Sequence, residues 1–201
     1  MKELENCKPE LFFQWFEKIC QIPHPSFHEE KLCDFLVTFA KERGLEYIRD
    51  AMNNLLIRVP ATEGYEDIPS YLLQSHLDMV PLVDEGVEFD FLTDPIRLRV
   101  VGNELRATGT TLGMDNGGGV AAMLAFVDDP EIKHPELELL FTVQEEVGMG
   151  GAQYFDFSQI KSRRMVNFDS GRTHSLCVSS AGSVSHLVQQ QFPRNRLRAM
   201  C

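Results

Sequence analysis

Residues 71–80 read Tyr-Leu-Leu-Gln-Ser-His-Leu-Asp-Met-Val, an apolar run that ends in an imidazole and a carboxylate two positions apart. The run predicts a buried strand, and because side chains alternate along an extended chain, His76 and Asp78 should point the same way. A buried strand has no structural use for such a pair at its end. A metal site does, because one ring nitrogen binds the ion while a nearby carboxylate orients the ring. We therefore expect His76 to be a metal ligand and Asp78 its orienting partner.

The size and charge of the chain narrow the classes of partner. It has 201 residues, of which 43% are hydrophobic and 24% charged, as is typical of one soluble globular domain. Its formal net charge of −11 argues against nucleic acid and against anionic membrane surfaces, since both select clusters of Lys and Arg. We expect no nucleic-acid or membrane partner, whereas cation binding stays open.

Cysteine use and the N-terminus indicate a reduced, cytoplasmic location. The five cysteines are scattered and odd in number, and no Cys-x-x-Cys spacing occurs, so we expect neither a disulfide framework nor a thiolate zinc site. No apolar run reaches the roughly 18 residues that span a bilayer, and the first five residues are too acidic and polar for a signal peptide.

Helical and strand periods alternate along the chain, which predicts an α/β fold. Helices are expected over 9–21 and 26–44, and Ser26 with Glu29 has the spacing of a capping box at the start of the second. Strands are expected at 45–49, 54–59, 71–80, 96–101, 104–107, 137–143 and 164–168. Two further helices are expected at 120–127 and 152–157. The acidic stretch 81–95 has no period and is expected to be a surface loop.

Residues 108–119 read Thr-Gly-Thr-Thr-Leu-Gly-Met-Asp-Asn-Gly-Gly-Gly and lead directly into an apolar helix. Such glycine density indicates backbone that packs closely against something else. A nucleotide-binding loop would need a closing Gly-Lys-Ser/Thr or a Gly-x-Gly-x-x-Gly spacing, and neither occurs. A helix N-cap would explain Asp115 but not the glycines on both sides of it. Asp115 is therefore a second candidate ligand.

Two later strands also end in carboxylates. Glu145 and Glu146 follow the apolar run 137–143, and Asp169 follows the run 164–168. Two adjacent carboxylates at the end of a buried strand repel each other unless a cation or a proton intervenes. This arrangement suggests that one carboxylate of the pair binds a metal and that the other is a free base.

These acidic strand ends are expected to meet, because open α/β sheets bind ligands beyond the carboxyl ends of their strands. One histidine among several carboxylates suits Zn²⁺, Mn²⁺ or Co²⁺. The number of carboxylates further suggests two metals that share a bridging ligand. The set that we expect to converge is His76, Asp78, Asp115, Glu145, Glu146 and Asp169.

The motifs at 75–80, 109–117, 145–149 and 167–170 together resemble the aminoacyl-histidine dipeptidases, also called peptidase D or cytosolic carnosinase-like enzymes, a branch of the dizinc metallopeptidases. The resemblance runs from about residue 5 to about residue 184. It implies a mixed-sheet, zinc-exopeptidase-like catalytic domain flanked by helices. It also implies hydrolysis of small peptides of the Xaa-His type.

The same resemblance implies a role for each candidate residue. His76, Asp115, Glu146 and Asp169 would hold two divalent ions, with zinc as the expected metal and manganese or cobalt as alternatives. Asp115 would bridge the two ions and Asp78 would orient His76. Glu145 would be the general base that deprotonates the metal-activated water.

Members of this family also contain parts that this sequence lacks. A lid and dimerisation domain follows a Ser-Ala-Gly-Gly-like segment, here 180–183, and a returning catalytic half then supplies a last metal-binding histidine. We therefore expect 1–184 to be the N-terminal part of a catalytic domain, and 185–201 to begin the lid domain or to be a non-native tail. The full-length form is expected to be a homodimer through the lid.

Two other functions stay open. The same site could serve an N-acyl amino acid amidohydrolase of this family, because the substrate contacts come largely from the missing regions. A non-catalytic fragment that binds metal or pairs with another subunit is the third possibility, and it leaves the activity of this truncated chain open.

Overall fold

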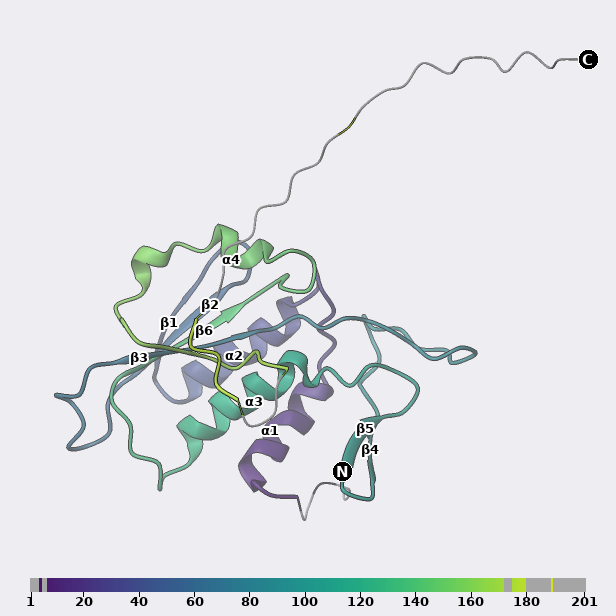
Figure 1. The fold of residues 1–201 in the computed structure, drawn as a ribbon, viewed down its shortest axis with the longest axis horizontal. Helices are drawn as coiled ribbons and strands as arrows, with labels where there is room; N and C mark the ends of the chain where they lie inside the picture. Colours follow the sequence, from purple (N-terminus) through teal and green to yellow (C-terminus); the bar gives the residue numbers. More distant parts are fainter. Residues whose placement is uncertain (1–3, 5–6, 172–174, 180–188, 190–201) are drawn as a thin grey trace, which may run out of the picture. The chain divides into compact units, whose positions relative to one another are not determined.

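The computed structural model describes residues 4, 7–171, 175–179 and 189. The chain divides into two units, Met1–Asp169 and Ser170–Cys201, and the first contains every helix and strand of the described residues (Figure 1). The boundary expected at 184/185 lies outside the described residues.

A five-stranded mixed sheet forms the centre of the first unit. Its strand order is β1-β2-β6-β3-β7. β1 (Glu46–Arg49) and β2 (Leu55–Val59) are the predicted hairpin, and β2 pairs antiparallel with β6 (Leu137–Thr142). β3 (Tyr71–His76) lies parallel to β6 on one side and to β7 (Met165–Asn167) on the other. The carboxyl ends of β3, β6 and β7 therefore meet at one edge, as expected.

Three helices cover one face of this sheet (Figure 1). They are α1 (Glu10–Cys20), α2 (Glu30–Glu42) and α3 (Met114–Asp128). The main core forms between them and alternate strand residues such as Leu55 and Ile57, while the intervening Leu56 faces a smaller cluster on the other side. This alternation is what a two-sided sheet requires of its strands. The α/β class with helices flanking a mixed sheet is confirmed.

The second face is covered more thinly. α4 (Gly150–Tyr154) begins two residues before the expected helix at 152–157, and a short 3₁₀ turn, η1 (Phe157–Gln159), follows it. Phe155, between them, packs on Leu56, Leu72 and Leu140. β4 (Leu98–Val101) and β5 (Glu104–Ala107) form the predicted separate hairpin.

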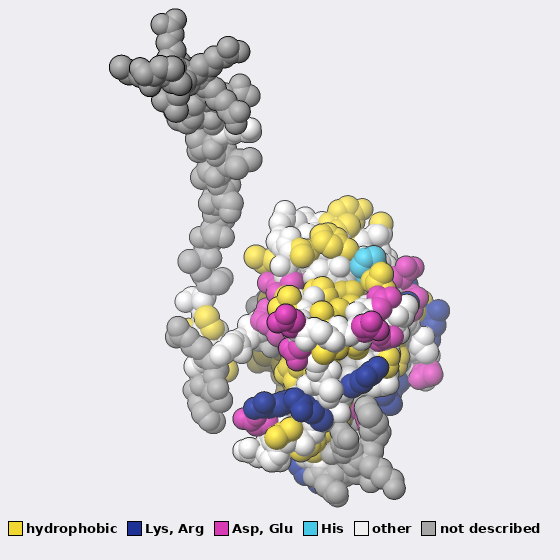
Figure 2. All heavy atoms as spheres, turned by 90° about the vertical axis from the view of Figure 1, so that its right-hand side faces the viewer, with side chains coloured by type: hydrophobic (Ala, Val, Ile, Leu, Met, Phe, Trp, Pro, Cys, Tyr) yellow, Lys and Arg dark blue, Asp and Glu magenta, His cyan; other side chains and the backbone are white. Residues whose placement is uncertain are grey.

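The acidic stretch 81–95 is a loop, as predicted, and its carboxylates Asp84, Glu85, Glu88 and Asp90 are exposed. Figure 2 views the side of the molecule from which this loop projects, and acidic and apolar side chains are intermingled on it. Among the described residues, no helix combines the length and the apolar character needed to cross a bilayer.

Two predicted helix starts are wrong. The side chains of Ser26 and Glu29 do not cap α2: Ser26 Oγ donates to Asp78, and Glu29 Oε1 accepts from Phe27 and Gln144. α3 begins at Met114 rather than at 120, with a kink at Asp115 and Asn116.

Tight packing explains the early start of α3. A Cβ atom at Gly119 would lie 2.7 Å from Ser75 Oγ and 2.9 Å from Phe168 Cβ, so only glycine lets the helix approach β3 so closely. Gly113, just before the helix, has φ of 70°, a left-handed value that suits glycine. The glycine density thus reflects close backbone packing, as the sequence indicated.

Candidate metal centre

His76 lies at the centre of the site. It is the last residue of β3, and its side chain is 1% exposed. Its Nδ1 lies 2.9 Å from the carbonyl oxygen of Asp78; because a carbonyl only accepts, Nδ1 carries the proton and donates. In the neutral ring Nε2 then keeps its lone pair, on the side of the ring that faces Asp115. One free ring nitrogen means that His76 can ligate a single ion.

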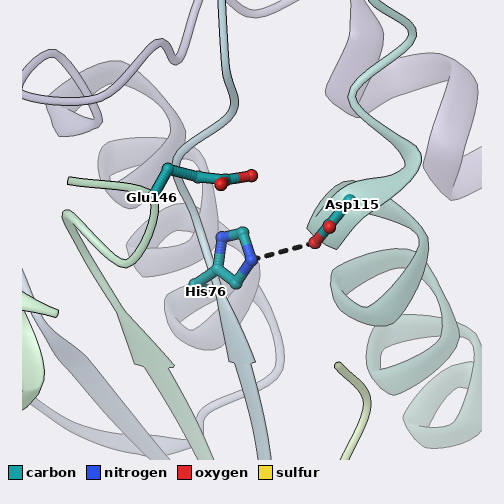
Figure 3. Close-up of side chains that lie close together, drawn as sticks. All are labelled: His76, Asp115 and Glu146. Atoms are coloured by element: carbon teal, nitrogen blue, oxygen red, sulfur yellow. Dashed lines mark hydrogen bonds and ion pairs between the residues drawn. The ribbon is translucent and has the colours of Figure 1, made fainter. Parts of the chain in front are cut away.

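Three carboxylates from different segments surround Nε2. Asp115 Oδ1 lies 3.0 Å away, and Glu145 Oε2 and Asp169 Oδ2 each lie 3.8 Å away. Figure 3 shows Asp115 reaching toward the ring from the start of α3, while the Glu146 side chain lies above the ring and points in the direction of Asp115. The sheet thus brings together residues that are distant in the sequence.

The ligand atoms fall into two groups small enough for an ion. Side-chain atoms of His76, Asp115 and Glu146 all lie within 4.8 Å of one another, and so do those of His76, Glu145 and Asp169. Both groups include His76, and its single free nitrogen can bind an ion in only one of them at a time. The donors are one imidazole and otherwise oxygens, which suits Zn²⁺, Mn²⁺ or Co²⁺. The residues present therefore fit a divalent metal.

The kink at the start of α3 aims Asp115 at this site. The Asp115–Asn116 peptide bond is cis, and the Asp115 side chain remains 70% exposed. Asn116 is buried: its Nδ2 donates to the carbonyl of Phe168 at 3.3 Å, and its carbonyl accepts from Ser75 Oγ at 3.2 Å. Asn116 thereby ties the ligand-bearing turn to β3 and to the exit of β7.

Asp78 is fully buried and holds more than the histidine. Its Oδ1 accepts the backbone N–H of Glu145 at 2.9 Å, and its Oδ2 accepts that of Glu146 at 3.2 Å and the Ser26 hydroxyl at 2.8 Å. The same Oδ1 lies 3.5 Å from His76 Nδ1. Burial opposes ionisation of Asp78, but its contacts with His76, the Glu145 amide and Ser26 outweigh burial and lower its pKa.

The pKa values of His76, Glu145 and Glu146 are all raised in this site. Burial alone would lower the pKa of His76, yet Asp78, Glu145 and Asp115 outweigh it and raise that pKa to about 9. Desolvation raises the pKa of Glu145; His76 opposes this shift, and the smaller effects of neighbouring carboxylates add to it. Desolvation and Asp115 likewise raise the pKa of Glu146. Such mutual repulsion is what a bound cation would relieve.

All six predicted site residues are within this cluster, and the sequence reasoning missed several supporting ones. The spacing of Ser26 and Glu29 predicts a helix cap, and Asn116 lies within a stretch whose glycines are its distinctive feature. His24 is buried, and its Nε2 has no hydrogen-bond partner among the described residues. No spacing in the sequence separates these residues from ordinary helix-start and loop residues.

An α/β domain with a histidine and several carboxylates at the ends of its parallel strands defines this chain as a candidate metal-binding domain. It belongs to peptidase family M20/M25/M40, whose sequence pattern matches residues 72–170.

Named relatives agree with this family. The chain is 40% identical over 198 residues to the cytosol non-specific dipeptidase of Escherichia coli K12, an alignment that covers 96% of this chain and 41% of that protein. The crystal structure of aminoacylhistidine dipeptidase from Vibrio alginolyticus matches with a TM-score of 0.83 and 43% identity, over 85% of this chain and 35% of that one. The chain thus spans about two fifths or less of the length of these relatives.

A more distant structure shares the fold. Aminopeptidase PepT from Bacillus cereus matches with a TM-score of 0.68 at 23% identity, over 80% of this chain and 43% of that one. At this identity the likeness concerns the fold alone.

Proposed function

We propose that this chain is the metal-binding part of a dipeptidase that hydrolyses small peptides of the Xaa-His type. The observation that supports this most strongly is the convergence of His76, Asp115, Glu145, Glu146 and Asp169 on one edge of the sheet. The names of two relatives add support, one for dipeptides in general and one for aminoacyl-histidine substrates.

The proposed centre holds two divalent ions, with zinc favoured over manganese or cobalt. Asp115 would be the ligand shared by the two ions, because its exposed carboxylate lies nearest to His76 and has two oxygens. His76, Glu146 and Asp169 would complete the ligand set that this chain supplies. When bound, the ions would polarise the peptide carbonyl and lower the pKa of the attacking water.

Glu145 is the proposed general base. Its carboxylate is partly exposed at the rim of the site, and its raised pKa suits a group that accepts a proton and later gives it up. It takes the proton of the attacking water and delivers it to the amine of the departing residue. Asp78 fixes the Glu145 backbone while this occurs.

The proposal extends to the setting of the whole protein. Its partner is a small peptide substrate, its location is the cytoplasm, and its longer form is a homodimer through the lid domain. The cytosolic relative supports the location. The dimer rests only on the family resemblance of the sequence.

The test is a hydrolysis panel on the metal-loaded chain, run beside metal titration. Alanyl-histidine, a dipeptide without histidine and N-acetyl-histidine separate the substrate classes. Faster cleavage of alanyl-histidine than of the others is the expected result. Cleavage of N-acetyl-histidine alone would favour the acyl amino acid hydrolase. Metal binding without turnover would favour a non-catalytic fragment. If the chain neither binds metal nor hydrolyses any of these compounds, the proposal is contradicted.

A further inference from the structure

The turn that carries Glu145 and Glu146 is held in an unusual way. Four consecutive backbone N–H groups, those of residues 143–146, donate to side-chain oxygens rather than to a neighbouring strand. Val143 donates to Asn54 Oδ1 at 3.2 Å and Gln144 to Glu29 Oε1 at 3.0 Å. The next two N–H groups donate to Asp78. Side chains from three separate segments therefore set the path of this turn.

Glu29 is the member of this set that the metal chemistry does not explain. It is 3% exposed, at the N-terminal end of α2, and carboxylates are rarely so buried without a specific partner. Its Oε1 accepts two N–H groups, from Phe27 at 3.1 Å and from Gln144 at 3.0 Å. Its spacing from Ser26 would suit a helix cap, but neither side chain caps α2.

Both amides that Glu29 binds belong to residues with left-handed backbones. Phe27 has φ of 70° and Gln144 has φ of 57°, values that residues other than glycine adopt at a cost. Such conformations persist where the surroundings hold them in place. Gln144 directly precedes the Glu145–Glu146 pair, so its backbone direction determines where both carboxylates point. A single oxygen of Glu29 thus holds the backbone of Gln144, the residue that leads into the Glu145–Glu146 pair.

We propose that Glu29 is a positioning residue for the metal centre, which acts by holding the left-handed Gln144 so that Glu145 and Glu146 face His76 and Asp115. It touches neither substrate nor metal. Because this role concerns the Glu145–Glu146 pair, it rests on the metal-binding function proposed above. Ser26 supports the same turn, because its hydroxyl donates to the Asp78 carboxylate that accepts the Glu145 and Glu146 N–H groups.

The variants separate hydrogen bonding from charge and volume. Glu29→Gln keeps an acceptor oxygen at the same reach and removes the charge. Glu29→Met keeps the approximate volume and removes the acceptor, so the Gln144 N–H loses its partner. Glu30→Met is the matched control, because Glu30 is the exposed neighbour on the same helix turn.

The measurement is Co²⁺ titration of each folded 201-residue variant, followed by the visible absorption of the bound ion. We expect Glu29→Met to weaken Co²⁺ binding about tenfold or more and to change the band shape, as loss of an outer support does at other metal sites. Glu29→Gln should restore binding to within about threefold of the wild type, and Glu30→Met should bind as the wild type does. A folded Glu29→Met variant that binds Co²⁺ like the wild type would overturn the proposal.

A second measurement decides the matter where Glu29→Met does not fold or where the wild type binds no Co²⁺. In the wild-type chain the Gln144 amide should exchange with solvent about a hundredfold or more slower than an unstructured amide. Exchange at the unstructured rate would show that Glu29 does not hold it and would overturn the inference. Failure of Co²⁺ binding by the wild type, with Gln144 protected, would instead count against the proposed function alone.

Discussion

Asp78 Oδ1 accepts the backbone N–H of Glu145 at 2.9 Å, which ties the residue after β3 to the residue proposed as the general base. The Asp78 carboxylate also accepts the Glu146 N–H, and the backbone carbonyl of Asp78 accepts from His76 Nδ1. Asp78 thus connects the histidine with both carboxylates of the turn. Its buried position makes it a support of the site rather than a ligand.

Replacing Asp78 by alanine should therefore weaken both the fold and the site. Two partly buried N–H groups lose their acceptor, and at about 1 kcal/mol each we expect the free energy of unfolding to fall by about 2 kcal/mol. Metal affinity should fall about 10–100-fold, as for other outer-shell supports. Urea unfolding and Co²⁺ titration measure the two effects. Asp78→Asn keeps one acceptor oxygen, so its stability and Co²⁺ affinity should lie between those of the wild type and of Asp78→Ala. An Asp78→Ala variant as stable as the wild type would contradict the supporting role of Asp78.

Replacing Asp115 by alanine should weaken metal binding but leave the stability of the fold nearly unchanged. Its side chain is 70% exposed and lies 3.0 Å from His76 Nε2, so its loss removes a ligand and little packing. We expect Asp115→Ala to leave the unfolding free energy of the metal-free chain within about 0.5 kcal/mol of the wild type. Co²⁺ affinity should fall about tenfold or more. Exposed Asp84→Ala is the control, and equal Co²⁺ affinity in both variants would argue against Asp115 as a ligand.

Glu145 and Glu146 are adjacent but have different proposed roles. Glu145→Gln should abolish most dipeptide turnover while Co²⁺ binding stays near the wild-type value, because the amide cannot accept the proton; general-base losses are about 10²–10⁴-fold. Glu146→Gln should weaken Co²⁺ binding as well as turnover. Parallel titrations and hydrolysis assays, on whichever form of the protein turns over, distinguish the two. Full activity of Glu145→Gln would eliminate it as the base.

His24 should make the stability of the chain depend on pH. Its ring is buried, and its Nδ1 lies 2.6 Å from the carbonyl of Ile22. Desolvation lowers its pKa below 6.5, although the Ile22 carbonyl and Asp78 favour the charged ring and His76 opposes it. The unfolded chain then binds the proton more tightly, so this contribution is complete above about pH 6.5 and is lost as the pH falls.

Urea unfolding of the metal-free chain from about pH 8 to about pH 5 measures this effect. The difference in stability between the wild type and His24→Phe should narrow toward acid pH. His28→Phe, which replaces an exposed histidine, is the control for loss of a histidine elsewhere. A difference between the wild type and His24→Phe that stays constant over this range would contradict the assignment.

Much of the fold follows from periodicity in the sequence. The aromatic stripe of α1, the hairpin of β1 and β2 and the apolar runs of β3 and β6 all have patterns that match their burial. The site residues were found because each lies where an apolar run or a glycine-rich turn ends. A parallel sheet brings such ends together, so topology supplies the convergence that spacing alone does not show.

The parts that were missed depend on distant contacts. Ser26 and Glu29 fit a capping box by spacing, but their partners Asp78 and Gln144 lie 52 and 115 residues further along. The sequence predicts too late a start for α3 because glycine and asparagine disfavour helices, and local sequence does not reveal the close packing of Gly119 against Ser75. Tertiary contacts override local preference in both places.

The most direct test is Co²⁺ titration of the wild-type chain beside His76→Ala, followed by visible absorption. His76 Nε2 faces Asp115, Glu145 and Asp169, so the chain should bind Co²⁺ saturably, and the ligand-field bands should be lost or strongly weakened in His76→Ala. Circular dichroism confirms that the variant is folded. Absence of saturable binding in the wild type, or identical titrations of the two folded proteins, would contradict a metal centre at this edge of the sheet.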